Sequence, residues 1–415
     1  MINIISSTQV ESPDNIDRGA LNISVTTPFN VPIENASITI SYTGGGGTVE
    51  TLTSNQSGQT DTVTLAAPPV EYSLDVTNLQ QPYSEYTLYV TAPGYEPFDL
   101  SGVQILADTI SDSSIVLTPT PGQIAIPPHT LYGEYPPKIA EDEIKPISQT
   151  GEIVLSRVVI PEYVVVHDGP PTDTSAANHY ILYSDYIKNV ASSEIYATWP
   201  ESTITANVLA IMSFTLNRVY TEWYRGKGFD FTITSSTAFD QKFMLGRNIY
   251  ENIANVVDNI FDNYLARPNV KQPILTQYCD GRRVSCPNWM TQWGSKALGD
   301  QGYTPIEIIR NFYGDDMYIS TAEQISGVPS SFPGYVLDIG ASGDKVRQVQ
   351  EQLNRIAEVY TLIPSIAADG IYGENTQEAV RTFQKIFKLP QTGTIDFATW
   401  YKISQIYVGV TRIAE

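Results

Sequence analysis

Apolar side chains recur every three to four positions between residues 201 and 220, and this spacing predicts a helix. The apolar face consists of Ile204, Leu209, Met212, Phe214, Leu216 and Val219. Pro200 stands where the first turn of a helix tolerates proline, and Glu201 suits the positive end of the helix dipole. The pattern therefore predicts a buried helix that begins after a break at Trp199 and Pro200.

Residues 20–120 show a different pattern, in which apolar and polar side chains alternate with period two. The alternation is clear in five segments, at residues 21–25, 36–42, 48–52, 85–91 and 114–117. Four consecutive glycines at 44–47 predict a turn between two of these strands. We expect a β-sandwich over residues 1–120, and the pattern resembles the carboxypeptidase-regulatory-like module of bacterial surface and wall proteins. No catalytic group of residues is evident within it.

Residues 121–160 are rich in proline, which neither a helix interior nor a central strand accepts. The prolines are Pro121, Pro127, Pro128, Pro136, Pro137 and Pro146. We expect a linker or extended arm, the kind of exposed segment that proteases cut. A plain tether is one interpretation. A processed pro-segment is the other, because an acidic unit precedes it and the apolar run at residues 153–160 has the pattern of a new folded unit.

Two further helical patterns lie in the C-terminal part, which we assign to residues 335–410. The residues that line them are Val346, Val349, Leu353 and Ile356 in one helix, and Ala379, Phe383 and Phe387 in the other. Asp369 and Gly370, with Gly373, predict a tight turn between them. Residues 337–407 resemble the three-helix peptidoglycan-binding domain. This resemblance implies a unit that concentrates its neighbour on an insoluble glycan, and it places Asp369 and Tyr372 on the binding surface.

Composition and charge narrow the function classes. The chain has 415 residues, of which 42% are hydrophobic, and a net charge of −21; the length favours two to four domains. Residues 1–120 hold 13 acidic side chains and one basic side chain, Arg18. Nucleic acid is excluded as a partner, because neutralising phosphates requires an excess of Lys and Arg. Solubility is the simple interpretation of the acidic N-terminal part, and a masking role is the functional one.

No membrane span or export signal is predicted. The first fifteen residues contain neither a basic region nor an apolar one, so we expect synthesis in the cytoplasm. Cys279 and Cys286 are too few for a disulfide framework, and a local disulfide, reduced thiols and half of a metal site all remain open. We expect no metal and no cofactor, because a zinc site needs three protein ligands and His167 is expected to end a core strand.

Glu194 is the carboxylate that stands out. It follows a run of small residues at 190–193 and precedes Ile195 and Trp199, so we expect it near the end of a helix. A carboxyl packed against apolar and aromatic side chains is desolvated, which raises its pKa and lets it hold a proton near neutral pH. A general acid requires this property. The alternative interpretation is a surface glutamate or a helix cap.

The sequence around and after Glu194 resembles the catalytic domain of the SpoIID/LytB family of peptidoglycan lytic enzymes. The matching segments are Phe-Asp-Gln at 239–241, Trp-Met-Thr-Gln-Trp-Gly at 289–294, and the helical, Tyr-ended stretch at 302–313. The resemblance implies a mixed α+β domain over residues 161–325.

This resemblance implies lytic transglycosylation, with Glu194 as the catalytic acid. Asp240 and Gln292 are weaker catalytic candidates, and a structural role is favoured for Asp240. The chain departs from the family at Met212, where an Arg is usual, and at Cys286, where a His is frequent.

Aromatic residues beside polar ones predict a sugar-binding wall, because flat rings provide stacking surfaces for sugars. Trp289 and Trp293 flank a polar pair, and we expect Gln292 and Asn288 to orient the sugar. The predicted substrate-binding residues of this region are Trp199, Asn288, Trp289, Thr291 and Trp293.

The order of the four parts resembles that of the clostridial spore cortex-lytic enzymes. This resemblance implies a multidomain α+β zymogen in the cortex or coat region of the spore. A subtilisin-like Csp germination protease would activate it, and its substrate would be cortex peptidoglycan that contains muramic-δ-lactam. Two alternatives remain: an N-acetylmuramoyl-L-alanine amidase, which would need a metal or an activated nucleophile, and a non-catalytic wall-binding or coat protein.

Overall fold

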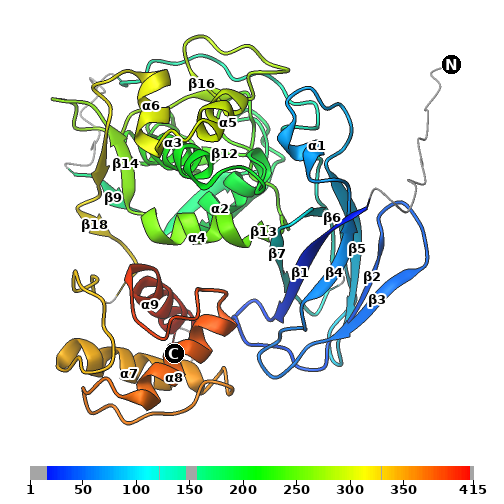
Figure 1. Cartoon of the computed structure of the whole chain (residues 1–415), viewed down its shortest axis with the longest axis vertical. Helices are drawn as coiled ribbons and strands as arrows, with labels where there is room; N and C mark the ends of the chain where they lie inside the picture. The colour runs from blue at the N-terminus through cyan, green and yellow to red at the C-terminus, as the bar shows by residue number, and fades with distance from the viewer. Residues whose placement is uncertain (1–15, 121, 146–156, 329, 412–415) are drawn as a thin grey trace.

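The computed structural model describes residues 16–120, 122–145, 157–328 and 330–411. It is a mixed α+β structure with several small sheets, as predicted (Figure 1). Strands dominate the N-terminal part, helices surround a long central helix in the middle, and three helices form the C-terminal part (Figure 1). We call residues 157–325 the central region. None of the helices in the described ranges is both long and apolar enough to cross a membrane.

The N-terminal part consists of two sheets around one core. The strands are β1 (Asp17–Thr26), β2 (Ser37–Tyr42), β3 (Thr48–Thr53), β4 (Val63–Ala67), β5 (Tyr83–Thr91), β6 (Phe98–Leu106), β7 (Ile110–Val116) and β8 (Gly122–Ala125), with a short helix α1 (Glu71–Leu74). One sheet has the order β3-β2-β5-β6-β8 and the other contains β7-β1-β4. Alternate side chains such as Leu21, Ile23 and Val25 enter the core, so the predicted period-two strands are confirmed.

One strand of this unit comes from the central region. β13 (Ile249–Tyr250) pairs antiparallel with β7, placing Ile249 opposite Asp112 and Tyr250 opposite Ser111. A side-chain hydrogen bond also connects the two parts: Gln104 Oε1 in β6 accepts from Arg247 Nη1 of the central region at 2.5 Å. The N-terminal part and the central region are therefore joined by a continuous sheet and by buried polar contacts.

The central region is organised around α3 (Glu201–Tyr220), which confirms the predicted helix and its start after Pro200. It contacts α2 (Tyr183–Glu194), α4 (Glu251–Ile260), α5 (Gln292–Asp300), α6 (Pro305–Tyr313) and β14 (Asn263–Ala266). The helix is buried nearly all round and not along one face alone. Several of its buried polar side chains find hydrogen-bond partners inside; Ser213 Oγ, for example, donates to the carbonyl of Ile274 at 2.8 Å.

Short strands complete the central region. They are β9 (Val159–Ile160), β10 (Tyr163–His167), β11 (Asn178–Leu182), β12 (Ile233–Thr234), β15 (Tyr278–Cys279), β16 (Met290–Thr291), β17 (Tyr318–Thr321) and β18 (Gln324–Ile325), with one 3-10 turn, η1 (Arg225–Lys227). β10 is the middle strand of the order β11-β10-β12. β15 and β16 pair in parallel and hold the ends of one loop together.

The segment predicted as an exposed linker differs from that prediction where the structure describes it. Residues 122–125 form β8, which pairs in parallel with β6, and Ile126, Leu131 and Lys145 are buried. Prolines remove backbone donors, but the residues between them hydrogen-bond to the central region; the N–H of Ile139, for example, donates to Ala238. Residues 146–156, with the expected cleavage and the predicted new start at residue 153, lie outside the described ranges.

The C-terminal part contains the three predicted helices, α7 (Asp344–Ala357), α8 (Glu374–Ile386) and α9 (Phe397–Thr411). Gln350 holds the predicted turn, since its Oε1 accepts from the N–H of Gly370, which lies at φ +78°. Gln384 repeats this contact one helix later with the N–H of Gly393. α9 packs against α4 (Figure 1).

Candidate functional site

Glu194 is the last residue of α2 and is 4% exposed. Two donors hold its carboxylate: the hydroxyl of Tyr278 donates to Oε2 at 2.5 Å, and the backbone N–H of Lys242 donates to Oε1 at 2.6 Å. The predicted position at a helix end is confirmed. Because both donors come from segments far along the chain, the orientation of this carboxyl is set by tertiary contacts.

The environment raises the pKa of Glu194 above the ordinary value of a glutamate, as predicted. Burial is the main cause, because it disfavours the charged form. The ammonium of Lys138 and the hydrogen bonds from Tyr278 and Lys242 act in the opposite direction. The pKa of Glu194 is thus set by two opposing effects: burial raises it, and the nearby ammonium and hydrogen-bond donors lower it.

Hydrogen-bonded polar side chains lie beside Glu194. Gln241 accepts at Oε1 from the hydroxyls of Thr215, at 2.8 Å, and Tyr186, at 3.2 Å. Its amide donates to the carbonyl of Ile211 in α3 at 3.1 Å. Burial and the neighbouring carboxylate raise the pKa of Tyr278, so its hydroxyl remains a donor at neutral pH.

Asp240, predicted as a weaker acid, lies in a structural network. It is 0% exposed and accepts at Oδ1 from Arg218 Nε at 2.7 Å. Its Oδ2 accepts from the Tyr224 hydroxyl at 2.7 Å and from the N–H and Oγ1 of Thr234 at 2.9 and 2.7 Å. A buried carboxylate with this many protein donors is satisfied without a ligand. Its position favours a structural role.

Three predicted sugar contacts are buried, and for them the prediction of a substrate-facing ring is wrong. Trp199 and Trp293 are 3% and 6% exposed and pack on one another with ring centroids 5.0 Å apart. Tyr372 is 1% exposed and donates to the carbonyl of Gly393 at 2.8 Å. Large aromatic rings bury a large apolar area when they pack against each other. These rings therefore belong to the core and not to a sugar-binding surface.

The remaining predicted contacts occupy different positions. Asn288 is exposed and Trp289 partly so, at the end of the loop that precedes β16. Thr291 caps α5, because its Oγ1 accepts from the N–H of Gly294 at 3.1 Å, and Gln292 is buried in the first turn of that helix. Asp369 is exposed, and its carboxylate accepts from the N–H of Ile371 at 2.9 Å.

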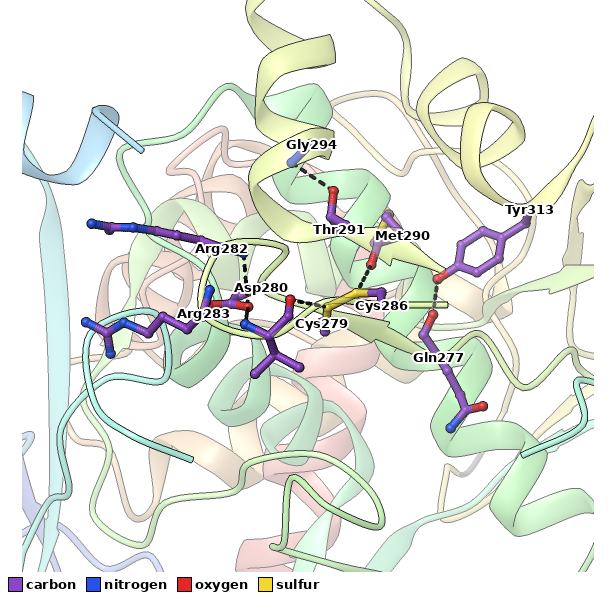
Figure 2. Close-up of a disulfide and its surroundings, with 11 residues drawn as sticks. Gln277, Cys279, Asp280, Arg282, Arg283, Cys286, Met290, Thr291, Gly294 and Tyr313 are labelled. Atoms are coloured by element: carbon purple, nitrogen blue, oxygen red, sulfur yellow. Dashed lines mark hydrogen bonds between the residues drawn. A yellow bond between two sulfur atoms is a disulfide. The ribbon is translucent and has the colours of Figure 1, made fainter. Parts of the chain in front are cut away.

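Cys279 and Cys286 form a disulfide that closes the loop between β15 and β16, with Cα atoms 5.9 Å apart (Figure 2). Of the three alternatives left open by the sequence, the structure has the local disulfide. Inside the loop, Asp280 accepts from the N–H group of Arg283 (Figure 2) and from that of Val284, both at 2.9 Å. The loop begins directly after Tyr278. The disulfide therefore helps to fix the position of the tyrosine whose hydroxyl donates to Glu194.

Sequence reasoning missed Tyr278, Lys242 and Lys138 as neighbours of Glu194. Each lies more than forty residues from Glu194 along the chain, and no periodicity marks it. The one feature of the sequence that could have pointed to Tyr278 is its position directly before Cys279, within the aromatic-rich part of the chain.

Within the described ranges, no three or more His, Cys, Asp or Glu side chains are grouped so that they could hold a metal ion. His167 ends β10, as predicted, and its Nδ1 lies 2.8 Å from Asn178 Oδ1. Its ring stacks on Phe231 with centroids 4.5 Å apart. His167 thus has the contacts of a core histidine.

Comparison with known proteins identifies the class of the C-terminal part. Residues 342–403 match the family described as "Putative peptidoglycan binding domain". This stretch contains α7 and α8 and the first half of α9. The C-terminal part of the chain therefore has the sequence of a peptidoglycan-binding domain.

Among solved structures, the N-terminal domain of SleB is 32% identical; the match covers 18% of this chain and 93% of that chain, with a TM-score of 0.16. A catechol 1,2-dioxygenase of Acinetobacter radioresistens is 16% identical, with 24% and 44% covered and a TM-score of 0.15. A chlorocatechol 1,2-dioxygenase of Pseudomonas putida is 14% identical, with 28% and 61% covered and a TM-score of 0.16. These TM-scores establish no common fold. No curated protein matches the chain.

Proposed function

We propose that this protein is a peptidoglycan lytic transglycosylase in which Glu194 is the catalytic acid and base. The observation that carries the proposal is the geometry of Glu194: a buried carboxyl with a raised pKa, held by two donors, in a chain that also carries a peptidoglycan-binding domain. The resemblance of residues 185–316 to the SpoIID/LytB family supports the same reaction.

The reaction needs a single carboxyl. Protonated Glu194 gives its proton to the glycosidic oxygen between N-acetylmuramic acid and N-acetylglucosamine, and the bond from that oxygen to the muramic C1 breaks. The C6 hydroxyl of the muramic sugar then attacks C1, and the Glu194 carboxylate takes the hydroxyl proton. The product carries a 1,6-anhydro ring, and no water is consumed. Hydrolases need a second carboxyl at a set distance, whereas here the nucleophile belongs to the substrate.

We further propose a role in the spore. The order of the parts resembles the clostridial cortex-lytic enzyme SleC, which implies a zymogen cleaved at germination by a subtilisin-like Csp protease. The substrate would then be cortex peptidoglycan with muramic-δ-lactam. The acidic N-terminal part and its polar join to the central region support a form in which the N-terminal part is retained until activation.

The test is mass spectrometry of the soluble products released from decoated spore cortex. The intact chain, the chain after limited subtilisin digestion, and the Glu194→Gln variant are compared, with Glu201→Gln as the matched control because Glu201 is exposed on α3. After digestion, the wild type and Glu201→Gln should release products with anhydro-muramic ends. Digested Glu194→Gln should release none. Free reducing ends would indicate a hydrolase, and released stem peptides an amidase. Full activity in Glu194→Gln would refute the assignment of the acid.

A further inference from the structure

The chain leaves α3 through a tight turn that gathers aromatic side chains. Glu222 lies at φ +48° and Gly228 at φ +85°, where the absence of a Cβ suits glycine. The N–H of Phe229 donates to the carbonyl of Tyr224 at 3.1 Å, so the chain folds back on itself around η1. Trp223 and Phe229 remain partly exposed on this turn.

This turn forms one wall of a cavity of about 540 Å³, which we call the aromatic pocket. Pockets that bind small ligands have volumes of roughly 300–1,000 Å³. Tyr224 is fixed in this wall, because its hydroxyl donates to Asp240 Oδ2 at 2.7 Å. The lining from the central region is Pro171, Trp223, Tyr224, Lys227, Phe229 and Phe239, and four residues between 139 and 145 line the other side.

Charged groups of both signs line the aromatic pocket. Lys145 and Glu141 neutralise each other, with Nζ and Oε2 2.6 Å apart. Lys227 is exposed, and its Nζ lies 3.2 Å from the centroid of the Trp223 ring. Asp142 is exposed as well. Neither Lys227 nor Asp142 forms an ion pair with another described residue, so the pocket offers a ligand an ammonium and a carboxylate.

This lining favours a charged ligand over an uncharged sugar. A sugar stacks on a free aromatic face, whereas ammonium groups already lie 3.2 and 4.4 Å from the centroid of the Trp223 ring. A short apolar chain that carries both a carboxylate and an ammonium fits better. Its carboxylate would pair with Lys227, its ammonium with Asp142, and its methylene groups would pack on Phe229 and Phe239.

The aromatic pocket is joined to the proposed acid by a short piece of chain. Phe239 stands three residues before Lys242, whose N–H donates to Glu194, and three Cα steps span at most about 11 Å. In peptidoglycan the stem peptide is attached to the lactyl group of muramic acid, the sugar whose bond Glu194 would break. An extended peptide of three residues spans about 10 Å, which matches this separation.

We propose that the aromatic pocket binds the stem peptide of peptidoglycan and that Lys227 and Trp223 select it. A diaminopimelate residue of such a peptide carries a carboxylate and an ammonium at the end of a short apolar chain, as the lining requires. This inference rests on the proposed function, because it names a second part of the same substrate. The glycan would lie at Glu194, and the peptide of the adjoining muramic sugar would lie in the pocket.

The experiment is isothermal titration calorimetry of the full chain with the tripeptide L-alanyl-γ-D-glutamyl-meso-diaminopimelate. The variants are Lys227→Met, Trp223→Leu and Asp142→Asn. Lys296→Met is the matched control, since it removes the same charge from a lysine on α5 that does not line the pocket. Trialanine tests whether any zwitterionic peptide binds, and chitotetraose tests whether a sugar chain occupies the same place.

We expect Trp223→Leu to weaken tripeptide binding about tenfold, because the largest ring of the wall is lost. Lys227→Met should weaken it about fivefold and Asp142→Asn about threefold, because each removes one exposed ion pair with the ligand. Lys296→Met and Glu194→Gln should bind like the wild type. The wild type should bind trialanine at least about tenfold more weakly, and chitotetraose should not displace the tripeptide. If Trp223→Leu does not fold, the exposed Lys227 still provides the test.

Equal affinity for the tripeptide in the wild type, Lys227→Met and Trp223→Leu would overturn the proposal. Binding of trialanine as tight as that of the tripeptide would also overturn it, and displacement by chitotetraose would make the cavity a sugar site instead. The expected binding pattern without anhydro product from any form of the chain would support the pocket and refute the transglycosylase function. Normal product with unchanged affinities in the variants would refute the pocket alone.

Discussion

Replacement of Asp240 by asparagine should destabilise the central region strongly while leaving the proposed acid in place. The substitution keeps the shape of the side chain and removes the charge that pairs with Arg218 at 2.7 Å in a site with no exposure. Loss of one partner of a buried ion pair typically costs about 3–5 kcal/mol, because the other charge remains buried and unpaired.

The structure places the expected cost at the lower end of that range. Arg218 keeps a second carboxylate, since its Nη2 donates to Glu141 Oε1 at 2.6 Å, and it keeps the carbonyl of Phe239 at 3.1 Å. An asparagine oxygen can still accept from Tyr224 or from Thr234. We therefore expect a loss of about 3 kcal/mol in the free energy of unfolding, which corresponds to roughly a 150-fold change in the folding equilibrium.

The assay is urea unfolding followed by tryptophan fluorescence, because four of the five tryptophans lie between residues 199 and 293. Exposed Asp315 offers the matched control, and Asp315→Asn should change the unfolding free energy by less than about 0.5 kcal/mol. Below the unfolding transition, the digested Asp240→Asn variant should still form anhydro products. A variant that unfolds like the wild type and yet forms no product would refute this reasoning and make Asp240 a catalytic residue.

Two other predictions concern the groups that hold Glu194. Tyr278→Phe removes a donor that lowers the pKa of Glu194, so this pKa should rise further; because the protonated form is the acid, the basic limb of the pH–rate profile should move to higher pH. Initial rates of product release across pH check this, and an unmoved limb would contradict it. Replacing Cys279 and Cys286 together by serine should cost about 2–3 kcal/mol for a loop of this length and increase amide exchange in residues 279–291. Exchange rates equal to those of the oxidised wild type would mean that Asp280 alone holds the loop.

Local patterns determined much of the fold. The helix at Glu201–Tyr220, the strands from Asp17 onward and the helices on either side of the Asp369 turn follow from the spacing of apolar residues, because helices and strands repeat at different periods. The position of Glu194 at a helix end also follows from its immediate neighbours.

Tertiary structure decided which side chains meet. Trp199 and Trp293 have the composition of a sugar platform, but they pack against each other, since their partners lie almost a hundred residues away in sequence. Prolines correctly excluded a helix from residues 122–145, but they could not show that Lys138 reaches the residues around Glu194. Hydrophobic period reports which face of an element is buried, whereas hydrogen-bond partners depend on how distant segments are brought together, and only the folded chain determines that.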